Sequence, residues 1–401
     1  MTISIGIINE KTKKASEGRV ALTSQIIKSV LGRFEGKLDF LVEMNSGVSS
    51  YNYDEEYKEV GARVVSQDEV LGADILLLVN APDQGIIRSI KKGALVVSFF
   101  NSAKNQGIVE ELKKENLQAV DINNLPRKLS NAQSMDALTS QSSIAGYKAV
   151  ITAAAEFSKI FPMLTTAAGT IRPASVLVLG AGIAGLQAIA TAKRLGAVVT
   201  AFDVRPEAKE EVLSLGARFL DLFSYISDEE KAVLSSINQE QGAGGLARKL
   251  TPEELAIQKK ATDKAVGSFD ILITTAQIPG SSPPEFVSMQ GVQYMKSGSV
   301  IVDMAASDKG GNVEGSKPNQ TVVVKDVKII GAPDLASEVA AASSALLAKN
   351  FMDIALHFIK ETEDGLVVNI DPEDELAKSM VITLEGAQRI GDEQMNRRTI
   401  L

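Results

Sequence analysis

The sequence contains no cysteine and no tryptophan, and only one histidine among its 401 residues. Without cysteine there is no disulfide and no thiolate nucleophile, and one imidazole cannot build a multi-histidine metal site, so we expect no metal. The net charge is −8 with no basic run, which argues against nucleic acid as a partner. No run approaches the roughly 18 apolar residues of a membrane helix, and residues 1–8 lack signal-peptide features. We therefore expect a cytoplasmic protein without direct membrane insertion, which does not exclude a membrane-bound partner.

The most informative stretch is a glycine-rich turn between an apolar run and a predicted helix. Residues 176–179 are typical of a strand buried on both faces, and three glycines follow in G-x-G-x-x-G spacing: Gly180, Gly182 and Gly185. The helix is expected from Leu186 to Leu195, and a second apolar run ends at Asp203. Strand, glycines, helix, strand and terminal acid in this order predict a dinucleotide-binding turn. The alternative is a βαβ unit without a ligand.

Each part of this pattern has a physical task in dinucleotide binding. The first glycine permits a tight turn, the second lets bare backbone approach a pyrophosphate, and the third lets helix and strand pack closely. The helix N-terminus offers N–H groups to phosphates, and Asp203 can accept hydrogen bonds from the ribose. An NADP 2′-phosphate beside Asp203 would meet repulsion of about 4 kcal/mol per charge pair at an effective dielectric constant of about 20, which Arg205 could soften. We predict NAD(H), contacted by Gly180, Ala181, Gly182, Ile183, Ala184, Gly185, Asp203, Val204 and Arg205.

Strand-like and helix-like segments alternate along the chain, as in doubly wound parallel sheets. One set covers about the first 125 residues, a long helix is predicted at residues 144–161, and a second set surrounds the glycine turn. The C-terminal segment is expected to return to the first domain. The sequence therefore predicts an α/β protein with two Rossmann-like domains separated by a cleft: residues 1–137 plus 338–401, and the NAD(H)-binding domain with its linking helix, residues 138–337.

A polar segment between the two sets of strands contains the candidate catalytic residues: Arg127, Lys128, Gln133, Asp136 and Thr139. Guanidinium, amide, carboxylate and hydroxyl groups can orient a carboxamide, a ribose or a phosphate. Clefts also form where two domains meet. The alternative is that Asp136 only caps the following helix and that the rest is a solvated linker.

Later loops carry further candidate cofactor contacts: Thr275, Ala276, Gln277, Asp308 and Asn312. These loops follow apolar strands, and ligands of open α/β sheets lie at the carboxyl ends of strands, so we expect them to face the nicotinamide half. Three glycines within residues 242–245 suggest a mobile lid, with Gly245 as a contact, or a simple helix–helix connection.

Several of these segments resemble the NAD(H)-binding component of proton-translocating NAD(P) transhydrogenase. They are Pro126-Arg-Lys, Ala132-Gln-Ser-Met-Asp-Ala-Leu-Thr-Ser-Gln141, Thr166-Ala-Ala-Gly-Thr170, the glycine turn, Thr274-Thr-Ala-Gln-Ile-Pro-Gly280 and Gly310-Gly-Asn312. Arg19 in its Glu-Gly-Arg-Val-Ala context also matches, as it does in the related alanine dehydrogenases. The similarity spans residues 1–385.

The resemblance implies a homodimer of chains with two Rossmann-like domains each. NADH held here would pass hydride directly to NADP⁺ held by another subunit, in a Re/Si-specific enzyme. Membrane-spanning subunits would couple the reaction to proton movement, which would place this chain peripherally at the inner face of the membrane.

The resemblance also implies roles for individual residues. An Arg–Gln–Asp loop positions the nicotinamide in this family, and Gln133 and Asp136 match it. Lys128 falls at the arginine position when counted without a gap, and Arg127 lies one residue before it. Thr139 stands where serine is usual, Leu246 where the mobile loop has tyrosine, and Gln277 where leucine is usual.

An alanine dehydrogenase is the alternative enzyme. Oxidative deamination needs a proton acceptor and a cation for the substrate carboxylate. The lysine and histidine of that family are replaced by Asn80 and Asn101, although Asp308 and Arg19 match its aspartate and arginine. Hydride transfer between nicotinamides needs only alignment of the rings. A non-catalytic NAD(H)-sensing subunit is the third possibility.

Overall fold

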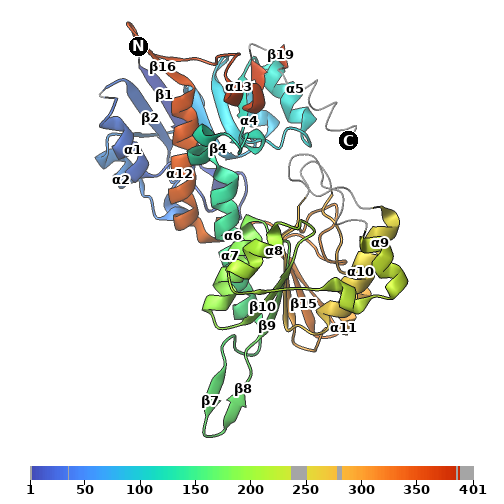
Figure 1. Ribbon diagram of the computed structural model, residues 1–401. Helices are drawn as coiled ribbons and strands as arrows, with labels where there is room; N and C mark the ends of the chain where they lie inside the picture. Colours follow the sequence, from blue (N-terminus) through green and yellow to red (C-terminus); the bar gives the residue numbers. More distant parts are fainter. Residues whose placement is uncertain (1, 35, 236–250, 278–281, 385–386, 389–401) are drawn as a thin grey trace. The chain divides into compact units, whose positions relative to one another are not determined.

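The computed structural model describes residues 2–34, 36–235, 251–277, 282–384 and 387–388. The chain divides into two compact units (Figure 1). Unit 1 comprises Met1–Gln141 and Ala336–Leu401, and unit 2 comprises Ser142–Leu335. Gly245 and Leu246 lie outside the described residues.

Unit 1 is built on an eight-stranded sheet in the order β19-β18-β6-β5-β4-β1-β2-β3. All neighbours from β6 to β3 are parallel, and β18 and β19 are antiparallel additions at one edge. The strands are β1 (Ile3–Ile7), β2 (Leu38–Glu43), β3 (Arg63–Val65), β4 (Ile75–Asn80), β5 (Leu95–Phe99), β6 (Gln118–Asp121), β18 (Val381–Leu384) and β19 (Ala387–Gln388). A two-stranded ribbon pairs β16 (Ile359–Thr362) with β17 (Gly365–Val368).

Helices cover both faces of this sheet (Figure 1). Alternate residues of one strand enter opposite cores because side chains alternate across a strand: Leu77 packs on one face and Leu76 on the other. Phe351 of α12 belongs to the first core, and Leu112 of α5 to the second. The helices are α1 (Ser24–Leu31), α2 (Asp54–Glu59), α3 (Gln67–Val70), α4 (Gln84–Ser89), α5 (Gln106–Lys114), α12 (Ala340–His357) and α13 (Glu375–Met380).

Unit 2 repeats the design with a seven-stranded sheet in the order β11-β10-β9-β12-β13-β15-β14, in which only β14 is antiparallel among the described strands. The strands are β9 (Ser175–Leu179), β10 (Val198–Phe202), β11 (Arg218–Phe219), β12 (Ile271–Thr274), β13 (Val300–Asp303), β14 (Gln320–Val324) and β15 (Val327–Gly331). The helices are α7 (Ile183–Arg194), α8 (Ala208–Ser214), α9 (Asp228–Ser235), α10 (Pro252–Val266) and α11 (Met289–Tyr294). Helix α6 (Ala137–Glu156) contains the point at which the chain passes from unit 1 to unit 2. The expected α/β class with two mostly parallel sheets is confirmed.

Both predicted ends of the helix at residues 144–161 are wrong. Helix α6 begins seven residues before the predicted start at residue 144, because the Asp136 side chain accepts a hydrogen bond from the Thr139 amide and so caps its first turn. It ends at Glu156 rather than at residue 161. The segment Ser337–His357 is the one helix among the described residues that is long and apolar enough to cross a membrane, by length and composition only. Half of its most apolar stretch is buried, and Leu347, Phe351 and Ile354 belong to the core of unit 1.

A hairpin that no pattern predicted precedes the glycine turn. It pairs β7 (Leu164–Thr166) with β8 (Gly169–Ile171), and all six strand residues are exposed.

Candidate functional site

The glycine turn of unit 2 joins β9 to α7 at the point where the strand order reverses, between β9 and β12. Gly180 has φ +96°, a conformation that residues with a side chain rarely adopt. A β-carbon on Gly185 would lie 1.9 Å from the Gly180 carbonyl oxygen, so glycine there permits close packing of α7. A β-carbon on Gly182 would have no described atom within 4 Å, and its φ is −74°. Gly182 is therefore the glycine that the protein's own packing does not require.

The first turn of α7 suits an anion. Gly182 is the N-cap residue and contributes no side chain, while its carbonyl oxygen accepts the first helical hydrogen bond from Leu186, at 2.8 Å. First-turn N–H groups have no partner within a helix, so they remain for a ligand. Ile183 is exposed beside them, and Ala184 is half-buried. This geometry suits the pyrophosphate that the sequence pattern predicts.

Asp203, directly after β10, connects the end of β10 to the glycine turn that follows β9. Its Oδ2 accepts a hydrogen bond from the Ala181 amide at 2.8 Å. Arg205 pairs with the same carboxylate, with Nε 3.0 Å from Oδ1 and Nη2 3.1 Å from Oδ2, and this pairing raises the pKa of Arg205. Val204 between them is half-buried. The guanidinium that could accommodate a 2′-phosphate is thus bound to the acid.

Thr275 and Asn312 organise the loop after β12. Thr275 donates from Oγ1 to the Gly180 carbonyl at 3.0 Å, which links this loop to the glycine turn. Asn312 is fully buried, accepts from the Ala276 amide at 3.0 Å, and donates to the carbonyls of Ala276 (2.9 Å) and Pro284 (2.7 Å). Asn312 therefore holds the backbone of this loop at Ala276 and Pro284 through three hydrogen bonds.

Two other predicted contacts are exposed. Gln277 donates to the Met304 carbonyl at 3.3 Å, and Asp308 lies in the tight turn between Ser307 and Gly310.

Asp303, the last residue of β13, was missed by the sequence analysis. Its buried carboxylate accepts hydrogen bonds from Thr274 Oγ1 (2.9 Å) and from the amides of Ala305 (3.0 Å) and Val313 (3.3 Å). Burial raises the pKa of Asp303, although the hydrogen bonds that it accepts act to lower that pKa. A β-carbon on Gly311 would lie 2.1 Å from Oδ2. The only sequence signal for Asp303 was an acid at the end of an apolar strand.

In unit 1, three of the candidate catalytic residues come together. Asp136 accepts hydrogen bonds from the Thr139 amide (2.8 Å) and hydroxyl (2.6 Å), and Arg127 Nε lies 3.8 Å from its Oδ2. Gln133 and Lys128 are exposed on the same turn, which contains a short 3₁₀ helix at Ser130–Met135. Asp136 thus caps α6, as the alternative interpretation held, and it also binds Arg127.

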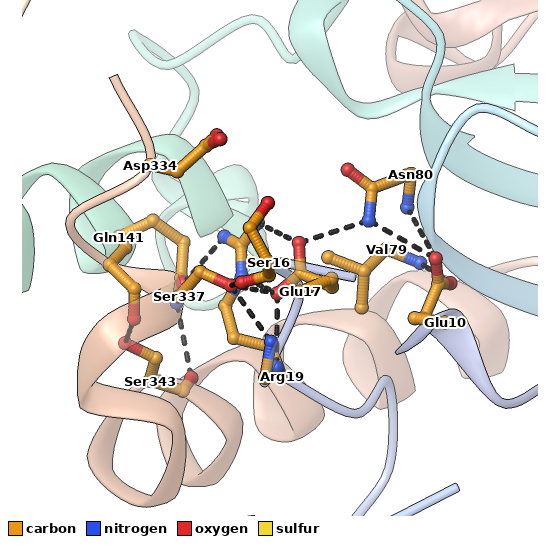
Figure 2. A network of polar contacts seen from close by, with 12 residues as sticks. Glu10, Ser16, Glu17, Arg19, Val79, Asn80, Gln141, Asp334, Ser337 and Ser343 are labelled. Carbon is orange, nitrogen blue, oxygen red and sulfur yellow. Dashed lines mark hydrogen bonds and ion pairs between the residues drawn. The ribbon is translucent and has the colours of Figure 1, made fainter. Parts of the chain in front are cut away.

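Unit 1 also contains a buried carboxylate network that the sequence analysis did not find (Figure 2). Glu10 follows β1 and accepts hydrogen bonds from the amides of Val79 (2.6 Å) and Asn80 (3.3 Å) and from Asn80 Nδ2 (3.1 Å). The Asn80 amide also donates to Glu17 at 2.9 Å. Burial raises the pKa of Glu10 to about 7, against the hydrogen bonds that it accepts.

Arg19 is held within this network. Its Nε and Nη2 each donate to a different oxygen of Glu17 at 2.8 Å, and its Nη1 donates to Gln141 at 3.0 Å. Burial alone would raise the pKa of Glu17, but the hydrogen bonds and charge of Arg19 outweigh it and lower the pKa to about 2. Glu17 therefore occupies the bidentate edge of the Arg19 guanidinium.

Two family domains match the chain: the alanine dehydrogenase/PNT N-terminal domain over residues 6–145 and the alanine dehydrogenase/PNT C-terminal domain over residues 149–390. The chain belongs to the alanine dehydrogenase/PNT family. Among members of this family, the first part of NAD(P) transhydrogenase subunit alpha of Rhodospirillum rubrum is 39% identical over 384 residues, covering 94% of this chain and 96% of that protein. The resemblance seen in the sequence is confirmed.

Other members of the alanine dehydrogenase/PNT family are similar to different degrees. The crystal structure of transhydrogenase from Sinorhizobium meliloti has a TM-score of 0.76 at 35% identity and covers 96% of this chain and 98% of that chain. Alanine dehydrogenase 1 of Staphylococcus aureus is 26% identical over 356 residues, covering 86% of this chain and 85% of that protein.

Proposed function

We propose that this family member is the NAD(H)-binding subunit of a proton-translocating, Re/Si-specific NAD(P) transhydrogenase. NADH bound at the glycine turn would supply a hydride from its nicotinamide ring, and NADP⁺ on a partner subunit would accept it. The two electrons travel with the hydride, so this chain needs to bind and orient and needs no proton acceptor.

The observation that carries the proposal is the internal use of Arg19. An alanine dehydrogenase needs a cation for the substrate carboxylate and a group that exchanges a proton. Here Glu17 takes the bidentate edge of Arg19, and Asn80, whose amide does not titrate, donates to Glu10 and Glu17. The higher identity to the transhydrogenase relative supports the same choice.

We assign the nicotinamide end to Gln133 and Asp136. The Gln133 amide is exposed and can both donate to and accept from a carboxamide. Arg127 takes the arginine role rather than Lys128, because its guanidinium lies beside Asp136. Thr139 keeps Asp136 in place by two hydrogen bonds, so a serine there would supply the same hydroxyl.

We assign NAD(H) rather than NADP(H) to unit 2. Gly180, Gly182 and the first turn of α7 would bind the pyrophosphate, and Asp203 would accept from the ribose hydroxyls. Because Arg205 is bound to Asp203, a 2′-phosphate would meet a carboxylate without a free cation beside it.

The remaining assignments concern the assembly. Relatives named as a subunit alpha point to further subunits. We propose that these bind NADP(H), span the membrane and couple proton movement, and that this chain lies at the cytoplasmic face of that membrane. The exposed hairpin β7–β8 supports a homodimer, since a second copy would cover its apolar side chains.

The test is hydride transfer from NADH to an NADP⁺ analogue, measured with this chain alone and then with an NADP(H)-binding transhydrogenase domain added. Activity is expected only in the mixture. Turnover by the chain alone with L-alanine and NAD⁺ would instead establish the dehydrogenase. Inactivity in both assays, with NADH still bound, would leave the sensing subunit.

A further inference from the structure

Asn350 is a buried polar residue on the apolar face of α12. It is 8% exposed, and Leu347, Phe351 and Ile354 around it on the helix are core residues of unit 1. A buried amide costs free energy unless its donors and acceptor are bonded. Both ends of the Asn350 amide are bonded, and both partners lie outside α12.

These two hydrogen bonds flank Asp136. Asn350 Nδ2 donates to the Ser134 carbonyl at 2.7 Å, and Asn350 Oδ1 accepts from Ser140 Oγ at 2.8 Å. Ser134 directly follows Gln133 in the 3₁₀ turn, and Ser140 lies in the first turn of α6. A single side chain therefore holds the backbone before Asp136 and the helix turn after it.

A second contact fixes the same helix turn to α12. Gln141 Nε2 donates to the Ser343 carbonyl at 3.1 Å, and its Oε1 accepts from Arg19, which Glu17 holds (Figure 2). Residues 343 and 350 are two helical turns apart, about 10 Å along the axis at 1.5 Å per residue. Two separated contacts on one core helix prevent the first turn of α6 from rotating about either of them.

The turn at residues 130–136 depends on such support. Ala132 and Met135 are buried and hold it by packing, but Gln133 and Ser134 are exposed. Packing of small apolar groups is non-directional, whereas a hydrogen bond to a carbonyl fixes the direction of that peptide. The peptide that Asn350 binds joins Ser134 to Met135 and begins at the residue directly after Gln133.

We propose that Asn350 is a positioning residue for the turn that carries Gln133 and Asp136. It touches neither substrate, and it sets the direction of the Gln133 side chain by holding the carbonyl of Ser134, the residue that follows Gln133. This inference rests on the proposed function for its effect on rate, but its effect on the turn does not.

The experiment compares Asn350→Leu, which keeps the branched shape of the side chain and removes both hydrogen bonds, with Asn350→Asp, which keeps only the acceptor for Ser140. The matched control is Asn52→Leu in the same unit, whose amide likewise donates to a carbonyl, that of Ser50, at 2.9 Å and accepts from the Ser24 amide at 3.2 Å. Two readouts are taken on the full chain: hydrogen–deuterium exchange of the peptide covering residues 129–141, and hydride transfer with the NADP(H)-binding domain together with the NADH Kd.

Both Asn350 variants are expected to exchange faster over residues 129–141 and to transfer hydride about 10- to 100-fold more slowly, the cost of a misplacement near 1 Å. Their NADH Kd should stay within about twofold, since the pyrophosphate and ribose contacts lie in unit 2. Asn52→Leu should change neither readout.

Wild-type exchange and rate in a folded Asn350→Leu variant would overturn the proposal, as would a loss of rate matched by an equal loss of NADH affinity. If Asn350→Leu does not fold, Ser140→Ala removes one of the two hydrogen bonds with little change in volume and must show the same pattern. A wild-type mixture without hydride transfer would refute the proposed function, and the exchange measurement would still decide whether Asn350 orders the turn.

Discussion

Gly182 differs physically from its two neighbours in the glycine turn. Gly180 has a positive φ and Gly185 has no space for a β-carbon, so the fold requires both. Gly182 has an ordinary φ and open space, which a ligand's phosphates would fill. If only the ligand requires glycine at position 182, replacing it should weaken NADH binding and leave the stability of the protein unchanged.

We therefore predict opposite results for two alanine variants. Gly182→Ala should leave the melting temperature nearly unchanged and raise the NADH Kd about tenfold or more, about 1.4 kcal/mol of binding free energy. Gly185→Ala should destabilise unit 2 by about 3 kcal/mol or more, because its β-carbon meets a backbone carbonyl. Calorimetry measures the melting temperature of each variant, and NADH titration measures its Kd. A destabilised Gly182→Ala with unchanged Kd would contradict this account of the turn.

Glu17 and Glu10 should give unit 1 opposite responses to pH. The pKa of Glu17 is lowered to about 2 from 4.5, so its contribution is present above pH 4.5 and is lost as the pH falls toward 2. The pKa of Glu10 is raised to about 7 from 4.5, so its contribution is present below pH 4.5 and is lost as the pH rises through 7. Each shift corresponds to about 3 kcal/mol as an upper estimate.

The prediction concerns differences in the free energy of unfolding between wild type and variant, measured by denaturant titration from pH 3 to pH 8. Glu17→Gln should be less stable than wild type at pH 7 by up to about 3 kcal/mol, and the deficit should shrink below pH 4.5. Glu10→Gln should gain on wild type as the pH rises from 5 to 8. Two differences with the same pH slope would show that the two carboxylates do not ionise as described.

At the scale of elements, the hairpin β7–β8 lacks the support that a ribbon needs. Its strand residues are all exposed, and Met163, Leu164 and Ile171 are 65%, 46% and 48% exposed. An isolated two-stranded hairpin is at best marginally stable in water. Contact with a second copy of the chain would supply the missing burial.

Replacing residues 164–171 by a short Gly-Ser linker should therefore convert the proposed homodimer to a monomer. NADH affinity should be unchanged, because the glycine turn and Asp203 are not altered. Sedimentation equilibrium gives the mass, and fluorescence titration gives the Kd. A variant that stays dimeric would place the interface elsewhere.

A single residue, Asp136, determines where helix α6 begins. The sequence pattern predicted its start at Ile144, where apolar residues begin, but Asp136 accepts the Thr139 amide and starts the helix seven residues earlier. Gly146 then lets α6 approach α7, since a β-carbon there would lie 2.1 Å from the Ala184 carbonyl oxygen. The close approach of Gly146 to Ala184 therefore packs α6 against the first turn of α7.

At the scale of the whole molecule, two similar sheets differ at the point where their strand order reverses. In unit 2 this point lies between β9 and β12 and carries the glycine turn. In unit 1 it lies between β1 and β4, and the Glu10 carboxylate binds the end of β4 there. Open α/β sheets bind ligands at this point. The chain's own side chains thus occupy in unit 1 the place that unit 2 leaves for a cofactor.

Features that depend on neighbours in the chain could be predicted from the sequence. The glycine turn, the acid at the end of β10 and the alternation of strands and helices are local patterns, and backbone sterics and side-chain period determine them. The absence of cysteine and the single histidine also limit the available chemistry through composition alone. These features were enough to predict the cofactor turn and the class of fold.

Which polar groups meet could be learned only from the folded chain. Asn350 and Ser134 are 216 residues apart, and Glu10 and Asn80 are 70 apart, so no local pattern relates them. Arg19 and Glu17 are only two residues apart, but the contacts of this pair with Gln141 and Asn80 and its burial depend on the same long-range folding. The burial of the Arg19–Glu17 pair and the hydrogen bonds of Asn350 to the turn that carries Gln133 are therefore properties of the tertiary structure.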